Sequence, residues 1–350
     1  MLNFRQLARL DDEELGRQDI LDVHLACAER LPGSEKIDVA RCRRIVDELA
    51  ARSTPYTERS LAKGIKVEPD DTEAKVRIRA MLQFLWRGAD IRYNLSKITD
   101  DCEWGIEESF VHGALYGDGG TCATLPILYT AVGRRLGYPL KLVDAWGPMW
   151  GHQFCRWDDP GGERFNIDAN HTGVTFFPDA HYRDPGLTPQ KEKQGLFLKS
   201  KTPRQELAGF MVARAHVCFD HALLRDCVDA YAWAAGLSPE NEFHMNMFKA
   251  RWNDWLDEVK SREPPGFPRT VIYGNSRRYP DAFPLKMEAE LIGLAAKDGL
   301  LRDPRLEVRF WRPLREGRAG VRAPKEVGVF PQPDDTVGLE LRFGNIHQGF

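Results

Sequence analysis

A cysteine that follows a run of glycines is the side chain in this sequence best placed to act as a nucleophile. Residues 117–121 lead into Cys122, and an apolar pattern of helical spacing then runs over residues 125–136. We predict Cys122 at or just before the N-terminus of that helix, where unpaired backbone N–H groups and the helix dipole favour a thiolate. The same N–H groups suit the oxyanion of an attacked carbonyl. Pro126 supplies no N–H, so we expect an irregular first turn.

A β-hairpin is predicted downstream of this helix. Residues 152–157 and 164–168 have the composition and alternation of strands, and residues 158–162, Asp-Asp-Pro-Gly-Gly, form a strong turn signal between them. A thiolate nucleophile works with a histidine base, and the histidine needs an acceptor that orients its ring. The hairpin supplies both residue types.

The centre of the turn determines which residues of the hairpin face each other. A turn centred on Pro160 places His152 opposite Asp168, and Arg156 opposite Arg164. Directly opposed side chains have Cβ atoms about 5 Å apart, so the imidazole and the carboxylate are expected to share a hydrogen bond. We therefore predict a site made of Cys122, His152 and Asp168 in which this face of the hairpin meets the cysteine helix.

Four other side chains are alternatives for parts of this site. His171 could replace His152 as the base, although it falls in a loop beyond the strand. His112 is expected on a helix, in a packing role. Tyr116 and Trp86 could each donate a hydrogen bond to an oxyanion, but core packing is the commoner role of such aromatic residues.

Metal chemistry has little support in the sequence. The seven cysteines are scattered and form no Cys-x-x-Cys pair. His152 and Cys155 point to opposite faces of their strand, and His216 and His221 are five residues apart, off the spacing that a helical metal pair prefers. No metal and no cofactor is predicted, and most of the cysteines are expected to be buried thiols in a reducing compartment.

Composition limits the class of partner. The chain has 350 residues and a formal net charge of -3, so its average surface does not favour nucleic acid or an anionic membrane. It has no segment of about 18 apolar residues that could span a bilayer. The N-terminus runs into acidic residues 11–14 without the apolar core of a secretory signal, which favours a cytoplasmic location.

Changes in pattern divide the chain into four parts. Residues 1–68 are predicted to be helical, and residues 69–200 to form an α+β core. Residues 201–262 return to helices of tetratricopeptide-like pattern. The remaining tail, residues 263–350, is predicted to be mixed α/β, with a helix at about 285–297 and strand-like runs at 306–310 and 337–343.

Three short motifs together resemble the core of the transglutaminase-like superfamily: Gly-Gly-Thr-Cys, Gly-His-Gln-Phe and Asn-Ile-Asp-Ala-Asn. The resemblance implies a transglutaminase/papain-like fold, in which the helix bearing the cysteine packs on an antiparallel sheet. It assigns Cys122 as nucleophile, His152 as base and Asp168 as orienting acid. Over about residues 35–258 the chain resembles the bacterial invasion-regulator-like branch, which adds N-terminal helices and tetratricopeptide-like helices to that core.

The resemblance implies two functions of different kinds. The first is an enzyme that transfers or hydrolyses the acyl group of peptide or protein amides through a Cys-His-Asp triad. The second is a catalytically weak or inactive scaffold that binds a peptide or protein, because members of that branch often lack the cysteine.

Overall fold

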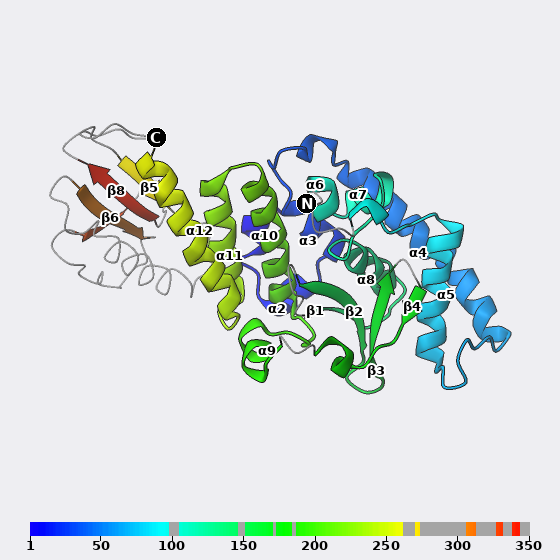
Figure 1. The fold of residues 1–350 in the computed structure, drawn as a ribbon. Coiled ribbons are helices and arrows are strands. Elements are labelled where there is room, and N and C mark those ends of the chain that lie inside the picture. The colour runs from blue at the N-terminus through cyan, green and yellow to red at the C-terminus, as the bar shows by residue number, and fades with distance from the viewer. Residues whose placement is uncertain are drawn as a thin grey trace.

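The computed structural model of the protein describes residues 1–97, 105–145, 151–170, 173–183 and 187–261, and four strands beyond them. Helices surround one antiparallel sheet, so the fold class is α+β, as the sequence predicts (Figure 1). In Figure 1 the sheet lies between the helices α10–α12 on one side and the pair α4 and α5 on the other.

Residues 1–97 are helical, which covers the part predicted to be helical (1–68) and the start of the predicted core. The helices are α1 (Phe4–Leu7), α2 (Asp12–Gly16), α3 (Ile20–Ala26), α4 (Val39–Ala62) and α5 (Glu73–Gly88), with 3₁₀ turns at Ser34–Lys36 and Leu95–Lys97. Between α3 and α4 the chain turns at Gly33, whose φ of +83° lies in the left-handed region. A Cβ at Gly33 would also lie 2.8 Å from Ile106, so only glycine fits there.

Short helices lead from this region to the sheet. They are α6 (Ile106–Ser109), α7 (His112–Tyr116) and α8 (Leu125–Arg135). The apolar side of α8 is buried through Leu128, Ala131 and Val132. The guanidinium of Arg134 binds the carboxylate of the buried Glu206 at 2.5 and 3.1 Å, which ties α8 to α10 (Pro203–Asp220).

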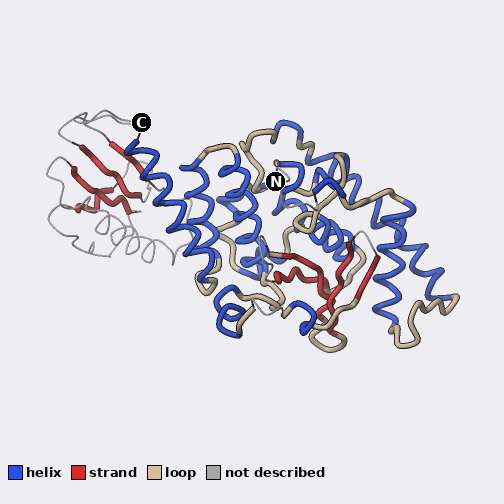
Figure 2. The backbone as a smooth tube through the Cα atoms, in the orientation of Figure 1, coloured by secondary structure: helices blue, strands red, loops and turns tan. Residues whose placement is uncertain are grey.

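The sheet has four antiparallel strands in the order β1-β2-β3-β4 (Figure 2). Their bounds are β1 (Leu140–Ala145), β2 (His152–Asp158), β3 (Arg164–Asn170) and β4 (Gly173–Thr175). The hairpin predicted from the turn signal is the pair β2–β3.

The turn of that hairpin lies one residue later in the chain than predicted. The backbone N–H of Asp159 donates to the carbonyl oxygen of Glu163 at 3.1 Å, so the turn covers residues 159–163 and is centred on Gly161 rather than on Pro160. The Asp159 carboxylate accepts a hydrogen bond from the N–H of Gly161 at 3.1 Å, which favours this turn.

The displaced turn changes the pairing of the strands. The predicted opposition of Arg156 and Arg164 is wrong: Arg156 lies opposite Asn166, and Arg164 lies opposite Asp158. The register is displaced by two residues. Because side chains alternate with a period of two, this displacement leaves every side chain on the face that the sequence predicts.

The two faces of the sheet are covered by different parts of the chain. One face contributes Leu142, Cys155 and Ile167 to the main core, together with α8. The other face contributes Val143 and Phe154 to a smaller core. That smaller core is completed by residues from the segment after β4, namely Tyr182, Leu187 and Leu198.

The segment that covers this second face continues to the last helices. It holds a 3₁₀ turn at Asp179–Tyr182 and α9 (Pro189–Gly195). Three longer helices follow within the part predicted to be helical (201–262): α10, α11 (Leu224–Leu237) and α12 (Glu242–Ser261), of which α11 contacts both of the others. Their buried residues belong to the same apolar cluster as those of α3, α4 and α8.

The described part of the tail is a second four-stranded sheet. Its strands are β5 (Thr270–Tyr273), β6 (Leu306–Arg312), β7 (Val327–Pro331) and β8 (Gly338–Phe343), in the order β5-β8-β6-β7. The two predicted strand-like runs correspond to β6 and β8. The helix predicted at about 285–297 lies outside the described residues.

Candidate active site

A glycine pair positions the turn that carries Cys122. The N–H of Gly120 donates to the carbonyl oxygen of Arg92, and its carbonyl accepts from the N–H of Asn94, both at 2.8 Å. Gly119 has a φ of +113°, and a Cβ there would lie 2.9 Å from the carbonyl oxygen of Arg92. The glycines of the motif thus allow the backbone to approach residues 92–94, and this contact places the cysteine.

Cys122 lies three residues before the first residue of α8, in a turn that Thr121 organises. The carbonyl of Thr121 accepts from the N–H of Leu125 at 2.9 Å, and its hydroxyl accepts from the N–H of Ala123 at 3.2 Å. In the same turn, the hydroxyl of Thr124 accepts a hydrogen bond from the N–H of Thr121 at 2.9 Å. Among the described residues, the N–H of Cys122 has no hydrogen-bond acceptor, so it can donate to a ligand.

Pro126 does not disturb this arrangement. It is the second residue of α8, in the first turn, where a backbone N–H has no intrahelical acceptor. Its carbonyl oxygen instead accepts a hydrogen bond from the thiol of Cys155 at 3.1 Å. That contact attaches the start of α8 to the middle of β2, which brings Cys122 close to the hairpin.

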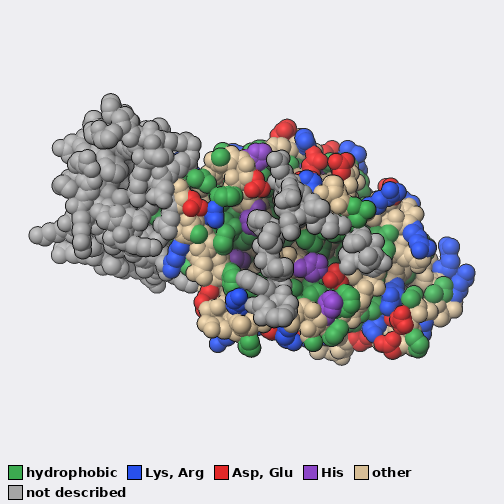
Figure 3. Space-filling model, in the orientation of Figure 1, with side chains coloured by type: hydrophobic (Ala, Val, Ile, Leu, Met, Phe, Trp, Pro, Cys, Tyr) green, Lys and Arg blue, Asp and Glu red, His purple; other side chains and the backbone are tan. Residues whose placement is uncertain are grey.

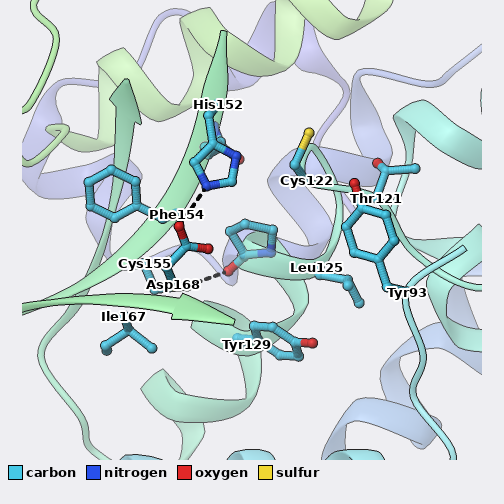
Figure 4. Close-up of a pocket in the computed structure, with 12 residues that line it drawn as sticks. Tyr93, Thr121, Cys122, Leu125, Tyr129, His152, Phe154, Cys155, Ile167 and Asp168 are labelled. Atoms are coloured by element: carbon cyan, nitrogen blue, oxygen red, sulfur yellow. Dashed lines mark hydrogen bonds and ion pairs between the residues drawn. The ribbon is translucent and has the colours of Figure 1, made fainter. Parts of the chain in front are cut away.

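His152 and Asp168 meet at the end of the hairpin. The Nε2 atom of His152 lies 3.0 Å from Oδ2 of Asp168 (Figure 4). The sequence predicts that the two residues lie directly opposite each other, and this prediction is wrong. When the observed register is continued to the end of the strands, Phe154 lies opposite Asp168. A diagonal pair on one face is still within reach of a ring as long as imidazole.

The prediction of which face meets α8 needs a correction. Cys155 and Ile167 face α8, whereas Phe154 faces the segment after β4. His152 is the first residue of β2, so its side chain reaches Cys122 around the end of the strand rather than across the covered face. Figure 4 shows the second ring nitrogen on the side toward Cys122.

The three residues line one small cavity. Its volume is about 20 Å³, which is room for about one water molecule. The lining also includes Tyr93, Thr121, Leu125, Pro126, Tyr129, Gln153, Phe154, Cys155 and Ile167. Cys122 is half-buried, and the side chain of His152 is 33% exposed, so both can be reached from solvent.

The electrostatic environment keeps the ring of His152 charged. Burial alone lowers its pKa, since it disfavours the cation, but hydrogen bonding with Asp168 and Cys122 and the negative charge of both outweigh burial. The pKa of His152 rises to about 10. At neutral pH the arrangement is therefore an imidazolium held between a carboxylate and a sulfur.

We predict that this pairing stabilises the folded protein less as the pH rises. The pKa of a histidine in an unfolded chain is about 6.5, and the folded value is about 10, so the contribution is complete below about pH 6.5 and lost toward pH 10. The melting temperature of the wild type should exceed that of His152→Gln by a margin that shrinks between pH 6.5 and 10. A margin that stays constant over that range would contradict the raised pKa.

The alternatives that the sequence leaves open lie elsewhere or outside the described residues. His171 is not among the described residues. His112 lies on α7, buried as expected. The hydroxyl of Tyr116 accepts from the N–H of Asp38, and the indole N–H of Trp86 donates to Tyr129 at 3.0 Å, so neither group points at Cys122.

Two tyrosines that carry no sequence signal belong to the site. Tyr93 lines the cavity beside Cys122 (Figure 4). Tyr182 donates from its hydroxyl to Oδ2 of Asp168 at 3.1 Å. Neither stands in a motif, and each comes from a segment that reaches the site only through tertiary contacts.

The surface of the described residues adds few constraints on partners. No helix among them is long and apolar enough to cross a membrane. Within the same residues, no three His, Cys, Asp or Glu side chains gather as metal ligands would. Acidic and basic side chains are interspersed over the face seen in Figure 3.

Comparison with known proteins returns no relative from which a function could be transferred. No protein-family model matches the chain, and no curated protein matches it significantly. The chemistry of the site therefore has to be argued from its own residues.

Proposed function

We propose that the chain is a cysteine-dependent hydrolase or acyltransferase of the transglutaminase-like superfamily, acting on peptide or protein amides. The observation that carries the proposal is the bond of 3.0 Å between His152 and Asp168 beside Cys122, in one cavity. A helix start bearing a cysteine, with histidine and aspartate from neighbouring antiparallel strands, is the arrangement that the resemblance implies.

In the proposed reaction, the thiolate of Cys122 attacks the amide carbon, and the carbonyl π electrons move to the oxygen. The N–H of Cys122 stabilises that oxyanion. The imidazolium of His152 gives its proton to the amide nitrogen as the C–N bond breaks, which leaves a thioester on Cys122. Asp168 holds the ring and stabilises its charge throughout.

The second half of the reaction releases the acyl group. His152, now neutral, takes a proton from water or from an amine as that nucleophile attacks the thioester carbon. The C–S bond breaks, and the thiolate and imidazolium are restored. Attack by water makes the protein a hydrolase, and attack by an amine makes it an acyltransferase.

A binding scaffold is the second candidate, and one observation favours it. A cavity of about 20 Å³ has little room for a substrate side chain next to Cys122. In that case the residues would bind a peptide or protein without turnover, and Cys122 would react as an ordinary thiol.

Selective alkylation tests the proposal. At pH 6, iodoacetamide should modify Cys122 at least about ten times faster than a free thiol, because the imidazolium of His152 beside it favours the thiolate, which is the reactive form. The matched internal controls are Cys27, Cys155, Cys218 and Cys227, which are buried and whose pKa values burial raises to about 12.

Peptide mapping after cleavage at glutamate and at arginine resolves Cys122, because Glu103, Glu107 and Glu108 separate it from Cys102, and Arg134 and Arg135 separate it from Cys155. Alkylation of Cys122 at the rate of a free thiol, in protein that melts cooperatively, would favour the scaffold over the enzyme.

A further inference from the structure

A short segment after β4 is held against the sheet next to the candidate site. The carboxylate of Asp179 accepts from the guanidinium of Arg156 at 2.6 Å and from the amide of Asn166 at 2.8 Å. The same amide of Asn166 donates to the carbonyl of Phe177 at 2.9 Å. Arg156 is completely buried, so these contacts fix residues 177–182 on the face that carries His152 and Asp168.

Tyr182 is the residue of this segment that touches the site. Its ring is buried and stacks on Phe154, with centroids 4.3 Å apart and planes 14° apart. Its plane is within 21° of the plane of the His152 ring, 6.3 Å away. Its hydroxyl donates to Oδ2 of Asp168, the oxygen that also binds Nε2 of His152.

We propose that Tyr182 is a positioning residue of the site, whose hydroxyl orients the Asp168 carboxylate so that one oxygen faces the ring of His152. The inference rests on the proposed function, because it assigns a role to a contact behind the proposed triad. A carboxylate can turn about its terminal torsion, and two donors that converge on Oδ2 select one orientation.

The surroundings of Tyr182 keep its hydroxyl protonated, so that it remains a hydrogen-bond donor. Burial and the neighbouring Asp168 raise its pKa, so the hydroxyl keeps its proton over the whole range in which an enzyme would work. The other titratable or charged groups near the Asp168–Tyr182 contact are His152, His181, Arg156, Asp179 and Cys155, and the ring of His181 lies edge-on to that of Tyr182 with centroids 5.2 Å apart. Arg156 and Asp179 bind each other, which leaves Tyr182 and His152 as the described side chains that bond to the Asp168 carboxylate.

The test is Tyr182→Phe, which keeps the stacked ring and removes only the hydroxyl. The rate of Cys122 alkylation by iodoacetamide is measured from pH 4 to 10. We expect the rate at pH 6 to fall about threefold to tenfold, the effect of one lost hydrogen bond. The part of the profile that His152 governs should move to lower pH, because a less well oriented Asp168 carboxylate raises the pKa of His152 less.

Tyr231→Phe is the matched control, because Tyr231 is also a buried tyrosine but lies on α11, outside the site. Its profile should superimpose on that of the wild type. A Tyr182→Phe profile that also superimposes, in protein of unchanged melting temperature, overturns the positioning role alone. A wild type whose Cys122 reacts like a free thiol overturns the proposed function instead.

If Tyr182→Phe does not fold, NMR of the wild-type protein can still test the role of the Tyr182 hydroxyl. A tyrosine hydroxyl proton bonded to a buried carboxylate exchanges slowly with water and should show an NMR contact to the Nε2 proton of His152. A hydroxyl proton in fast exchange with water, with the His152 signal resolved, would contradict the inference.

Discussion

Replacement of His152 by glutamine is expected to slow the alkylation of Cys122 at pH 6 by about tenfold to a hundredfold. An ordinary thiol with a pKa near 8.5 is only about 0.3% ionised at this pH. In the proposed ion pair the imidazolium stabilises the thiolate, and the pKa of about 10 keeps the ring of His152 charged. Glutamine is polar and of similar size but carries no charge, so the loss reports on electrostatics rather than on space.

Asp168→Asn should give a smaller loss, because the imidazolium remains but its anionic partner is removed. His221→Gln is the control for loss of a histidine: His221 is exposed, directly follows α10 and is not among the residues that line the cavity. Its rate should equal that of the wild type. The triad would be refuted by a His152→Gln variant that is folded and alkylated at the wild-type rate.

Arg156→Ala is expected to lower the free energy of unfolding by about 3–5 kcal/mol. The side chain is completely buried and donates to Asn166, to the carbonyl of Leu198 at 3.0 Å and to Asp179. Truncation removes all three bonds and leaves a carboxylate and two further acceptors beside a cavity. Urea unfolding followed by tryptophan fluorescence measures the change.

Arg164→Ala is the matched control for this prediction. Arg164 also approaches the carboxylate of Asp179, but at 4.0 Å and with a side chain that is 51% exposed. An exposed pair of this kind contributes less than about 1 kcal/mol, so the variant should unfold close to the wild type. Equal effects of the two substitutions would show that the buried network does not stabilise the segment after β4.

The elements that carry the candidate site follow from local patterns. The apolar residues at helical spacing, with the glycine pair before them, place Cys122 just before α8, and the alternation of β2 and β3 puts His152 and Asp168 on one face. These signals act over a few residues and do not depend on the rest of the chain. The predicted register failed by two residues because the turn signal does not fix the residue on which the turn is centred. The side chains kept their predicted faces only because the displacement is an even number of residues.

The sequence by itself determined the α+β class, the hairpin and the three residues whose types suit acyl chemistry. Only the tertiary structure decided how these residues meet. The attachment of α8 to β2 through Cys155, and the path of His152 around the strand end, depend on which face each element buries. Tyr182 reaches Asp168 because the buried Arg156 and Asp179 hold its segment in place. Contacts of this kind join segments that no local pattern relates, since they arise from packing and from the need to pair every buried polar group.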